Sequence, residues 1–576
     1  MNFVIIKYHK LKALVSIFSS IIVILILWFV LIGGLWEKDY NYSSDIKQIR
    51  SLYFANHLKG LKNHLGGVKA NIIEKQKSVD ILHYSLSFDL FPEEKKFNAS
   101  ATIKGRKLVR EIDSIHFNFY NNYDVSTVTI NGKKAGFELK DKFISIVRNF
   151  PVTDTFEVQI DYSGKPKRAG FVGFSFAKIN GTSVVYTLSE PTYASSWFPC
   201  NDFPTDKALL DIWITNDSSQ VSVSNGLLVG TEINGSRKTY HWKTLYPIST
   251  YLIALYSSNY EHFDDHYISL DGLDTMAIDY YVLPQNVDKA KFDFAEHPKF
   301  IKFFAETFGE YPFIKEKYGV AEFLWQMGAM EHQTITGVAS NFLGGKKFFQ
   351  DIYIHEVAHH WWGNAVGPKS WKDIWLNEGF STYCEALYDE HFYGSDALQS
   401  NMIKIKQNEF RNSLSNPGSF LFTQTVYNKG AWVLHMLRWE LGDELFFKIL
   451  KEYYEKYKYS NASTNDFKQV CETISQKDLD KFFDQWINGV GKIELNYEWE
   501  TEKFGDSYYN YLTINQEQDE YLEYHFLLEV AVQYEDDVEY HKFNIDRRSQ
   551  QIRIETDQLP EAIILDPNNW LLVSVN

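Results

Sequence analysis

The sequence contains little cysteine and no cluster of basic residues beyond its first dozen positions. Its 576 residues include three cysteines, Cys200, Cys384 and Cys471, and none of them belongs to a Cys-x-x-Cys pair. This excludes a disulfide framework and a cysteine zinc site. The formal net charge is −16, whereas a nucleic-acid-binding surface must be positive to neutralise phosphates. We therefore expect no nucleic acid among the partners of this protein.

Apolar and charged residues are present in ordinary amounts, at 45% and 23% of the chain. These fractions are typical of globular proteins that bury hydrophobic cores, and they exclude disorder, collagen or coiled coil as a description of the whole chain. A chain of 576 residues contains three to four domains if a domain has about 150 residues. Composition therefore predicts a multidomain globular protein.

The longest apolar run lies near the N-terminus. Residues 13–36 carry no charged side chain and follow the basic residues Lys7, Lys10 and Lys12. As a helix this run would be about 36 Å long, and the hydrocarbon core of a bilayer is about 30 Å thick. Basic residues favour the cytoplasmic side. We expect a single-pass membrane protein with a cytoplasmic stub at 1–12, a transmembrane signal anchor at 13–36 and all later residues outside the cytoplasm; a cleaved signal peptide is the alternative.

Alternation of apolar and polar residues occurs on both sides of a helix-rich region. It begins at Leu82–Leu90 and continues in short runs separated by Asn-Gly turn signals, which is typical of β-strands. Alternation returns near the C-terminus, for example at Leu528–Tyr534. The pattern predicts an α+β multidomain fold with a stalk or linker at 37–78, an N-terminal β domain at 79–265, a helix-containing domain at 266–491 and a C-terminal β domain at 492–576.

Longer periodic segments in the middle of the chain predict helices. The clearest are Lys299–Phe308, Phe348–Trp362, Ala431–Tyr457 and Phe467–Ile474. Thr464 and Asp466 precede the last of these segments at positions typical of a helix cap.

The second of these predicted helices contains a His-Glu-x-x-His pattern. His355 and His359 lie one turn apart on one face, where both imidazoles reach a single zinc ion. Glu356 lies beside that face and can take a proton from a water molecule at the ion. Glu378 follows His359 after 18 intervening residues, a spacing that lets a second helix supply a carboxylate ligand. Two histidines, one glutamate and an open position are typical of a catalytic zinc site.

Four separated motifs resemble those of the zinc aminopeptidases typified by aminopeptidase N (gluzincins, peptidase family M1). The first is His-Glu-x-x-His with Glu378. The others are Gly-Ala-Met-Glu-His at 328–332, Tyr-Asn-Lys-Gly-Ala at 427–431, and Thr-Leu-Ser-Glu-Pro-Thr at 187–192 followed by Phe-Pro-Cys at 198–200. The resemblance extends from about residue 79 to residue 576.

The resemblance implies an activity and a domain plan. It implies hydrolysis of N-terminal residues from peptides with free N-termini, with one Zn²⁺ per chain. It also implies a saddle-like N-terminal β domain, a thermolysin-like α/β zinc catalytic domain at 266–491 and a small C-terminal β-sandwich. Large members of the family continue into a helical-repeat domain. Because this sequence stops after the small β segment, we expect no helical-repeat domain here.

The resemblance assigns two glutamates to the substrate N-terminus. Glu331 would bind the ammonium group, and Glu190 from the β domain would be a second anchor, because carboxylates hold an ammonium at a fixed place. Two neighbouring positions depart from the family pattern. His332 stands where asparagine is commonest, and Leu188 replaces a glutamine two residues before Glu190.

Further residues receive roles from the same motifs. The backbone of Gly328 and Ala329 would run beside the substrate as an edge strand, since small residues permit close approach. Met327 would line the pocket for the first side chain of the substrate, and its flexible thioether suits a broad, apolar-tolerant pocket. The Tyr427 hydroxyl would donate to the oxyanion that develops during hydrolysis.

Two residues near the metal motif have open interpretations. Glu385 lies seven residues after Glu378 and on the same helix face. It is either a hydrogen-bond partner of a ligand histidine or a solvated charge. His360 points elsewhere on its helix and is interpreted as a packed or solvated histidine.

Three other functions are considered. A zinc endopeptidase is one, because His-Glu-x-x-His does not distinguish cleavage at chain ends from internal cleavage. An epoxide hydrolase with aminopeptidase side activity on the same fold is the second. A non-catalytic ectodomain is the third and is disfavoured, because every residue that the mechanism needs is present.

Overall fold

The computed structural model describes residues 74–576 apart from 148–153, 407–409, 419, 520 and 522. The predicted cytoplasmic stub and signal anchor, and nearly all of the predicted stalk, lie outside these residues. Within the described part of the chain, no helix is both long and apolar enough to cross a membrane. The described residues all belong to one unit, Phe54–Asn576.

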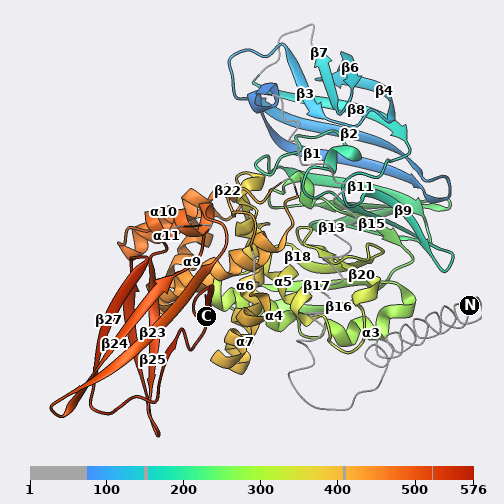
Figure 1. Cartoon of the computed structure of the whole chain (residues 1–576). Coiled ribbons are helices and arrows are strands. Elements are labelled where there is room, and N and C mark those ends of the chain that lie inside the picture. Colours follow the sequence, from blue (N-terminus) through green and yellow to red (C-terminus); the bar gives the residue numbers. More distant parts are fainter. Residues whose placement is uncertain (1–73, 148–153, 407–409, 419, 520, 522) are drawn as a thin grey trace, which may run out of the picture. The chain divides into compact units, whose positions relative to one another are not determined.

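Three sheets make up the N-terminal β region (Figure 1). The largest has the order β13-β14-β11-β1-β2-β8-β4-β5. Its strands are β1 (Val79–Phe91), β2 (Lys96–Lys107), β4 (Tyr123–Ile130), β5 (Lys133–Lys134), β8 (Thr155–Gly164), β11 (Leu209–Asp217), β13 (Leu227–Asn234) and β14 (Arg237–Lys243). The other two contain β3 (Ser114–Asn118), β6 (Gly136–Lys140) and β7 (Phe143–Val147), and β9 (Gly173–Ile179), β10 (Thr182–Leu188), β12 (Val221–Ser224) and β15 (Leu255–Ser258).

Strand β1 follows the predicted alternation except at its start. Tyr84, Leu86 and Phe88 are fully buried, as the pattern predicts. Leu82, expected on the same face, is instead 39% exposed, and Ile81 is buried. The pairing of β1 with β2 shifts register between Ile81 and His83. Such a bulge turns the preceding residues by one position, so the buried face changes from even to odd residues there.

A five-stranded sheet supports the site, in the order β16-β17-β18-β20-β19. Its strands are β16 (Glu261–Ile268), β17 (Thr275–Val282), β18 (Lys317–Phe323), β19 (Ala329–Met330) and β20 (Thr336–Ala339). Strands β17, β18 and β20 are parallel, and β19 pairs antiparallel with β20 at the edge. The domain boundary placed at residue 265 from the sequence falls inside β16, whose partner β17 belongs to this sheet.

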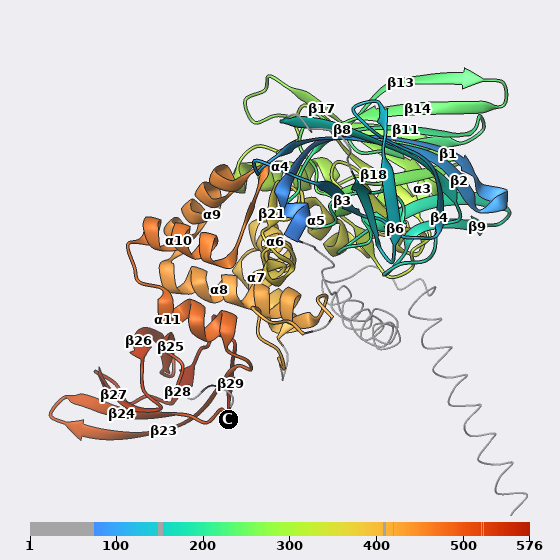
Figure 2. The ribbon, with the colours of Figure 1, turned by 90° about the horizontal axis from the view of Figure 1, so that it is seen from above.

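The α-helices of the described residues lie in the middle of the chain. They are α3 (Val287–Asp293), α4 (His297–Phe308), α5 (Gln350–Ala358), α6 (Trp375–Tyr393), α7 (Ser395–Ile405), α8 (Gly430–Leu441), α9 (Asp443–Tyr457), α10 (Thr464–Ser475) and α11 (Asp480–Phe483). Short π-helical turns occur at Thr425–Lys429 and Asp484–Asn488. Helices α5 and α6 contact each other, and both views show them side by side (Figures 1 and 2).

Glycines decide two features of this helical region. A side chain on Gly379 of α6 would lie 2.7 Å from the backbone of Gly430, so α6 packs backbone to backbone against the start of α8. The single helix predicted from Ala431 to Tyr457 is wrong, because the chain breaks at Gly442, whose φ is +82°. A left-handed φ of this kind ends a helix and favours glycine.

The C-terminal region forms two sheets. One contains β23 (Ile493–Phe504), β24 (Ser507–Gln516), β27 (Ser549–Thr556) and β29 (Val573–Val575), and the other contains β25 (Phe526–Gln533), β26 (Val538–Ile545) and β28 (Ala562–Leu565). Trp439 of α8 donates through Nε1 to the carbonyl oxygen of Leu527 at 2.8 Å, which links this region to the helices.

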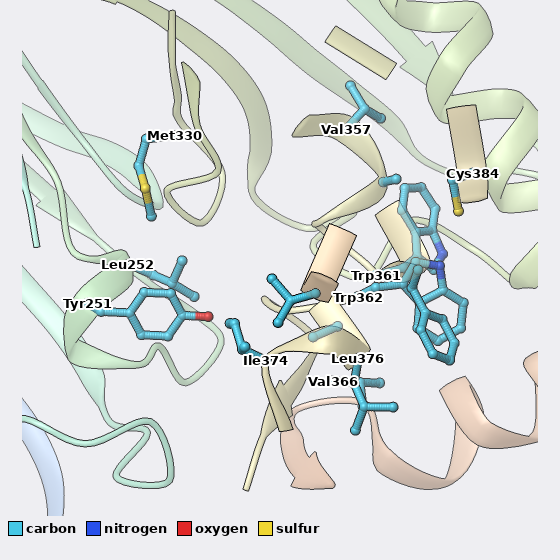
Figure 3. Close-up of a cluster of buried hydrophobic side chains, with 14 of the residues drawn as sticks. Tyr251, Leu252, Met330, Val357, Trp361, Trp362, Val366, Ile374, Leu376 and Cys384 are labelled. Carbon is cyan, nitrogen blue, oxygen red and sulfur yellow. The ribbon is translucent and has the colours of Figure 1, made fainter. Parts of the chain in front are cut away.

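Buried side chains from several elements lie around the residues that follow α5. Figure 3 shows Tyr251 and Leu252 on one side and Trp361 and Trp362 on the other, with Ile374 between them. All five side chains are at most 1% exposed. The turn after α5 is therefore packed between the N-terminal β region and the helices.

Candidate active site

The predicted metal ligands come from two helices. His355 lies in α5, His359 directly follows the last residue of α5, and Glu378 lies in α6. One ligand atom from each of His355, His359 and Glu378 lies within 4.8 Å of the others. Oε2 of Glu378 is 3.4 Å from Nε2 of both histidines. All three side chains are largely shielded from solvent, since Glu378 and His359 are buried and His355 is half-buried.

The hydrogen bonds of the two histidines fix which ring nitrogen is available. Nδ1 of His355 lies 3.0 Å from Oε1 of Glu385, and Nδ1 of His359 lies 3.0 Å from the carbonyl oxygen of Trp362. Both oxygens accept, so each Nδ1 carries the proton and each Nε2 presents a lone pair. Two such nitrogens and a carboxylate oxygen fit a zinc ion. Of the two interpretations of Glu385, the structure supports the hydrogen-bond partner.

The charges of these groups stabilise one another. Burial alone would lower the pKa of His355, but its hydrogen bonds to the carboxylates of Glu378 and Glu385 outweigh burial and raise that pKa to about 9. A metal ion at Nε2 would displace the second proton of the ring. Burial would likewise raise the pKa of Glu378, yet the two histidines lower it to about 2. Glu378 is therefore an ionised carboxylate over the whole physiological pH range, as a metal ligand must be.

Glu356 is buried beside the metal ligands with one oxygen unpaired. Its Oε2 has no hydrogen-bond partner among the described residues. Burial, followed by the negative charges of Glu331 and Glu378, raises the pKa of Glu356 well above its usual range. A carboxylate with a raised pKa and a free oxygen can accept a proton and hold it during a reaction.

A cluster of three carboxylates lies beside the two histidines and shares Glu378 with the metal ligands. Glu190, just after β10, and Glu331, just after β19, each place an oxygen within 4.8 Å of Glu378 and of each other. Glu190 is 6% exposed and Glu331 is 4% exposed. Oε1 of each lacks a partner in the described part of the chain. Burial first, and then the charge of Glu331, raises the pKa of Glu190 well above its usual range. A bound cation would compensate the buried negative charge of this cluster.

Tyr427 lies in the π-helical turn before α8 and faces the metal ligands. Its ring is 6.0 Å from the His355 ring, with 25° between the planes. Burial, and then the nearby charge of Glu378, raises the pKa of Tyr427 well above 10.0. The hydroxyl therefore stays protonated and can act as a hydrogen-bond donor.

The segment predicted to bind the substrate backbone lies at one edge of the five-stranded sheet. Ala329 starts β19, and the carbonyl oxygen of Gly328 accepts from the Ala339 amide at 3.3 Å. Strand β19 is terminal in the sheet order, so among the described residues no strand pairs with its other edge. An extended chain can add to a sheet at such an edge. Met327 lies in the turn before β19 and is half-buried, and its role in a side-chain pocket stays a prediction.

The histidine that departs from the family pattern is packed. His332 is fully buried, and its Nδ1 forms a 2.6 Å hydrogen bond with the Tyr256 hydroxyl. Burial lowers the pKa of His332 to about 3, which keeps the ring neutral. Leu188, the other departure, is buried in the β region.

Two polar residues that were not predicted from the sequence also form hydrogen bonds with site residues. The Ser381 hydroxyl lies 3.0 Å from Nδ1 of His359, and Asn364 donates through Nδ2 to the carbonyl oxygen of Glu331 at 2.7 Å. Ser381 follows Glu378 by three residues, which places it on the same helix face. That spacing is a signal from which Ser381 could have been found. No local pattern marks Asn364, because its partner is 33 residues away.

The fold and this site define a protein with a metal site of the catalytic type, and comparison with known proteins specifies its family. A model of the peptidase family M1 domain matches residues 292–486. A model of the peptidase M1 N-terminal domain matches residues 81–252. Together these matches cover more than half of the chain, and the chain belongs to peptidase family M1. The donor set fits zinc, and the solved M1 peptidase of Deinococcus radiodurans is a zinc metallopeptidase.

Curated relatives are named aminopeptidases. Probable aminopeptidase 2 of Sulfurisphaera tokodaii is 28% identical over 66% of this chain and 50% of its own. Aminopeptidase N of Lactococcus lactis is 25% identical over 71% of this chain and 51% of its own. The chain thus spans about half the length of these relatives.

Solved structures share the fold. The M1 zinc metallopeptidase of Deinococcus radiodurans superposes with a TM-score of 0.62 and 23% identity, over 72% of this chain and 95% of that one. Aminopeptidase A of Legionella pneumophila, solved with aspartic acid, gives a TM-score of 0.76 and 20% identity, over 87% of this chain and 60% of that one.

Proposed function

We propose that this protein is a zinc-dependent aminopeptidase that removes residues one at a time from the N-termini of peptides. The observation that carries the proposal is the cluster of Glu190 and Glu331 beside Glu378, in which two buried carboxylate oxygens lack partners. An ammonium group supplies the positive charge and the hydrogen bonds that such oxygens need. The aminopeptidase names of the relatives support the same activity.

The protein residues divide the work of hydrolysis. His355, His359 and Glu378 would hold the zinc ion, which supplies polarisation of the scissile carbonyl and a lowered pKa for the attacking water. Glu356 takes a proton from that water and passes it to the leaving amine. The Tyr427 hydroxyl donates to the negative charge that develops on the carbonyl oxygen.

Positioning comes from the two remaining parts of the site. The ammonium group between Glu190 and Glu331 places the first peptide bond near the metal ligands, and the free edge at Gly328–Ala329 aligns the following backbone. Fixing a substrate in this way contributes to rate because it replaces a bimolecular encounter by an oriented one. Met327 would contact the first side chain.

A matched pair of peptides tests the activity. A ten-residue peptide with a free N-terminus should lose single residues in sequence, and a chelator should stop the reaction. The same peptide with an acetylated N-terminus should react at least a hundredfold more slowly. Time-resolved mass spectrometry follows both. Internal fragments from the acetylated peptide at a comparable rate would favour an endopeptidase instead.

We also propose that residues 13–36 anchor the protein in a membrane with the catalytic part outside the cytoplasm. The support is the length of this uncharged run and the basic residues before it. The full-length protein should remain with the membrane fraction, and protease added from the outer side should degrade most of it. A soluble form that begins near Glu37 would show a cleaved signal peptide.

A further inference from the structure

The turn that carries Glu331 has a strained backbone. It joins β19 to β20 and closes with a hydrogen bond from the Ile335 amide to the carbonyl oxygen of His332 at 3.0 Å. Thr334 in this turn has a φ of +63°. A β-branched residue rarely adopts this left-handed conformation, and it persists only where its surroundings force it. The contacts of the turn should therefore show what holds it.

Groups from both the β region and the catalytic region hold the turn. From the β region, Asn225 donates to the carbonyl oxygen of Gln333 at 2.6 Å, and the Gly226 amide donates to the Thr334 hydroxyl at 2.8 Å. Lys317 of β18 donates to the carbonyl oxygen of Thr334 at 3.1 Å. These bonds attach the segment after Glu331 to the β region and to β18.

His360 holds the same turn from the side of the metal ligands. Its Nδ1 lies 3.2 Å from the carbonyl oxygen of Glu356, and its Nε2 lies 3.2 Å from the Thr334 amide. A carbonyl oxygen only accepts and an amide only donates, so Nδ1 carries the proton and Nε2 accepts. One imidazole thus joins the backbone of Glu356 to the turn that carries Glu331.

The ring of His360 cannot easily move. It is fully buried, and the rings of Tyr311 and Tyr318 lie 5.7 Å and 5.0 Å from it. His360 also follows directly after the metal ligand His359. Any displacement of the turn relative to the metal ligands must therefore break a hydrogen bond of this ring or displace its aromatic neighbours.

We propose that His360 is a positioning residue that sets the distance between Glu331 and the metal ligands, and thereby the position of the amine that the site accepts. The inference rests on the proposed aminopeptidase function. A fixed distance suits an amine on the α-carbon of the first residue and disfavours an amine one methylene further away. Loosening the Thr334–His360 bond weakens the distinction between the two amine positions. A general loss of stability would instead lower the reaction rates of both kinds of substrate equally.

The test compares alanyl and β-alanyl amides in variants of similar side-chain size. His360→Met replaces the nitrogen that accepts from the Thr334 amide by a weakly accepting sulfur, and His360→Gln retains a strong acceptor. In His360→Met, the ratio of kcat/KM for the alanyl over the β-alanyl amide should fall at least tenfold. His360→Gln should keep most of the wild-type ratio. His297→Met, at a buried histidine of α4 outside the site, serves as the control and should leave the ratio unchanged.

Thr334→Gly provides a second approach if His360→Met does not fold. Glycine suits the left-handed φ, but it removes the hydroxyl that accepts from Gly226, so the turn is loosened from its other side. The same fall in the ratio is expected. An unchanged ratio in His360→Met, or in Thr334→Gly if His360→Met does not fold, overturns the proposal, and so does an equal fall in kcat/KM for both substrates. A wild-type protein that cleaves neither amide refutes the aminopeptidase function itself, which is a separate outcome.

Discussion

Replacing Glu331 by glutamine tests the ammonium site with the smallest change of shape. Glu331 is 4% exposed and has one oxygen without a partner, so a substrate ammonium bound there is a desolvated ion pair. Removing one partner of such a pair costs about 2–5 kcal/mol. Because Glu190 remains as a second carboxylate, we take about 3 kcal/mol, which corresponds to about a 150-fold loss in kcat/KM.

The loss should depend on the charge of the substrate. An acetylated N-terminus carries no ammonium, so Glu331→Gln should leave its slow hydrolysis nearly unchanged, and the preference for free N-termini should fall by the same factor of about 150. Stability should change in the opposite direction. The variant removes one negative charge from a buried cluster of like charges, so its melting temperature without substrate should rise.

Two measurements check this prediction together. Steady-state kinetics on an aminoacyl amide and its acetylated analogue give the preference, and differential scanning calorimetry gives the melting temperature. Zinc content should match that of the wild type, because no ligand has changed. If Glu331→Gln reduced both substrates equally, or kept the wild-type preference, the assignment of Glu331 to the ammonium group would be wrong.

Three further predictions concern other parts of the molecule. Glu356→Ala should abolish turnover while zinc measured by mass spectrometry stays bound; more than a small residual rate would contradict its role as the base. Gly379→Ala should destabilise the fold by about 1–3 kcal/mol in urea titrations, because the added carbon meets the backbone of Gly430 at 2.7 Å; unchanged stability would show that α6 and α8 are packed less closely. Burial raises the pKa of Asp566 to about 7, so the native protein retains a proton that the unfolded chain releases from about pH 4. The free energy of unfolding should therefore fall as pH rises from about 4 to 7, by up to about 1.4 kcal/mol per unit from this group, and Asp566→Asn should show a smaller slope than the wild type.

The parts of the site that the sequence predicts are those encoded by local spacing. His355 and His359 are one helical turn apart, and Glu378 needs only a short connection to return beside them, so their convergence follows from periodicity. Glu385 could be placed on the correct helix face, but whether it bonds a histidine depends on how α5 and α6 pack. The two anchors, Glu190 and Glu331, came from the family resemblance alone, because 140 positions separate them.

Backbone irregularities account for most of what could not be predicted. The bulge after Ile81 and the break at Gly442 each interrupt a pattern that looks continuous in the sequence. The cap of α10 was predicted only in part. Asp466 belongs to the capping box as predicted, but the N-cap residue is Ser463 rather than Thr464. The left-handed turn at Thr334 has no local signal, because distant residues impose it.

The carboxylate cluster draws its members from two regions that are separate in the chain. Glu190 comes from the β region, whereas Glu331 and the metal ligands come from the region that the catalytic sheet and helices build. The residues proposed for hydrolysis therefore all come from one region. The proposed binding of a free N-terminus, in contrast, requires carboxylates from both regions. To convert this protein into an endopeptidase, one would leave α5 and α6 unchanged and redesign the loop after β10.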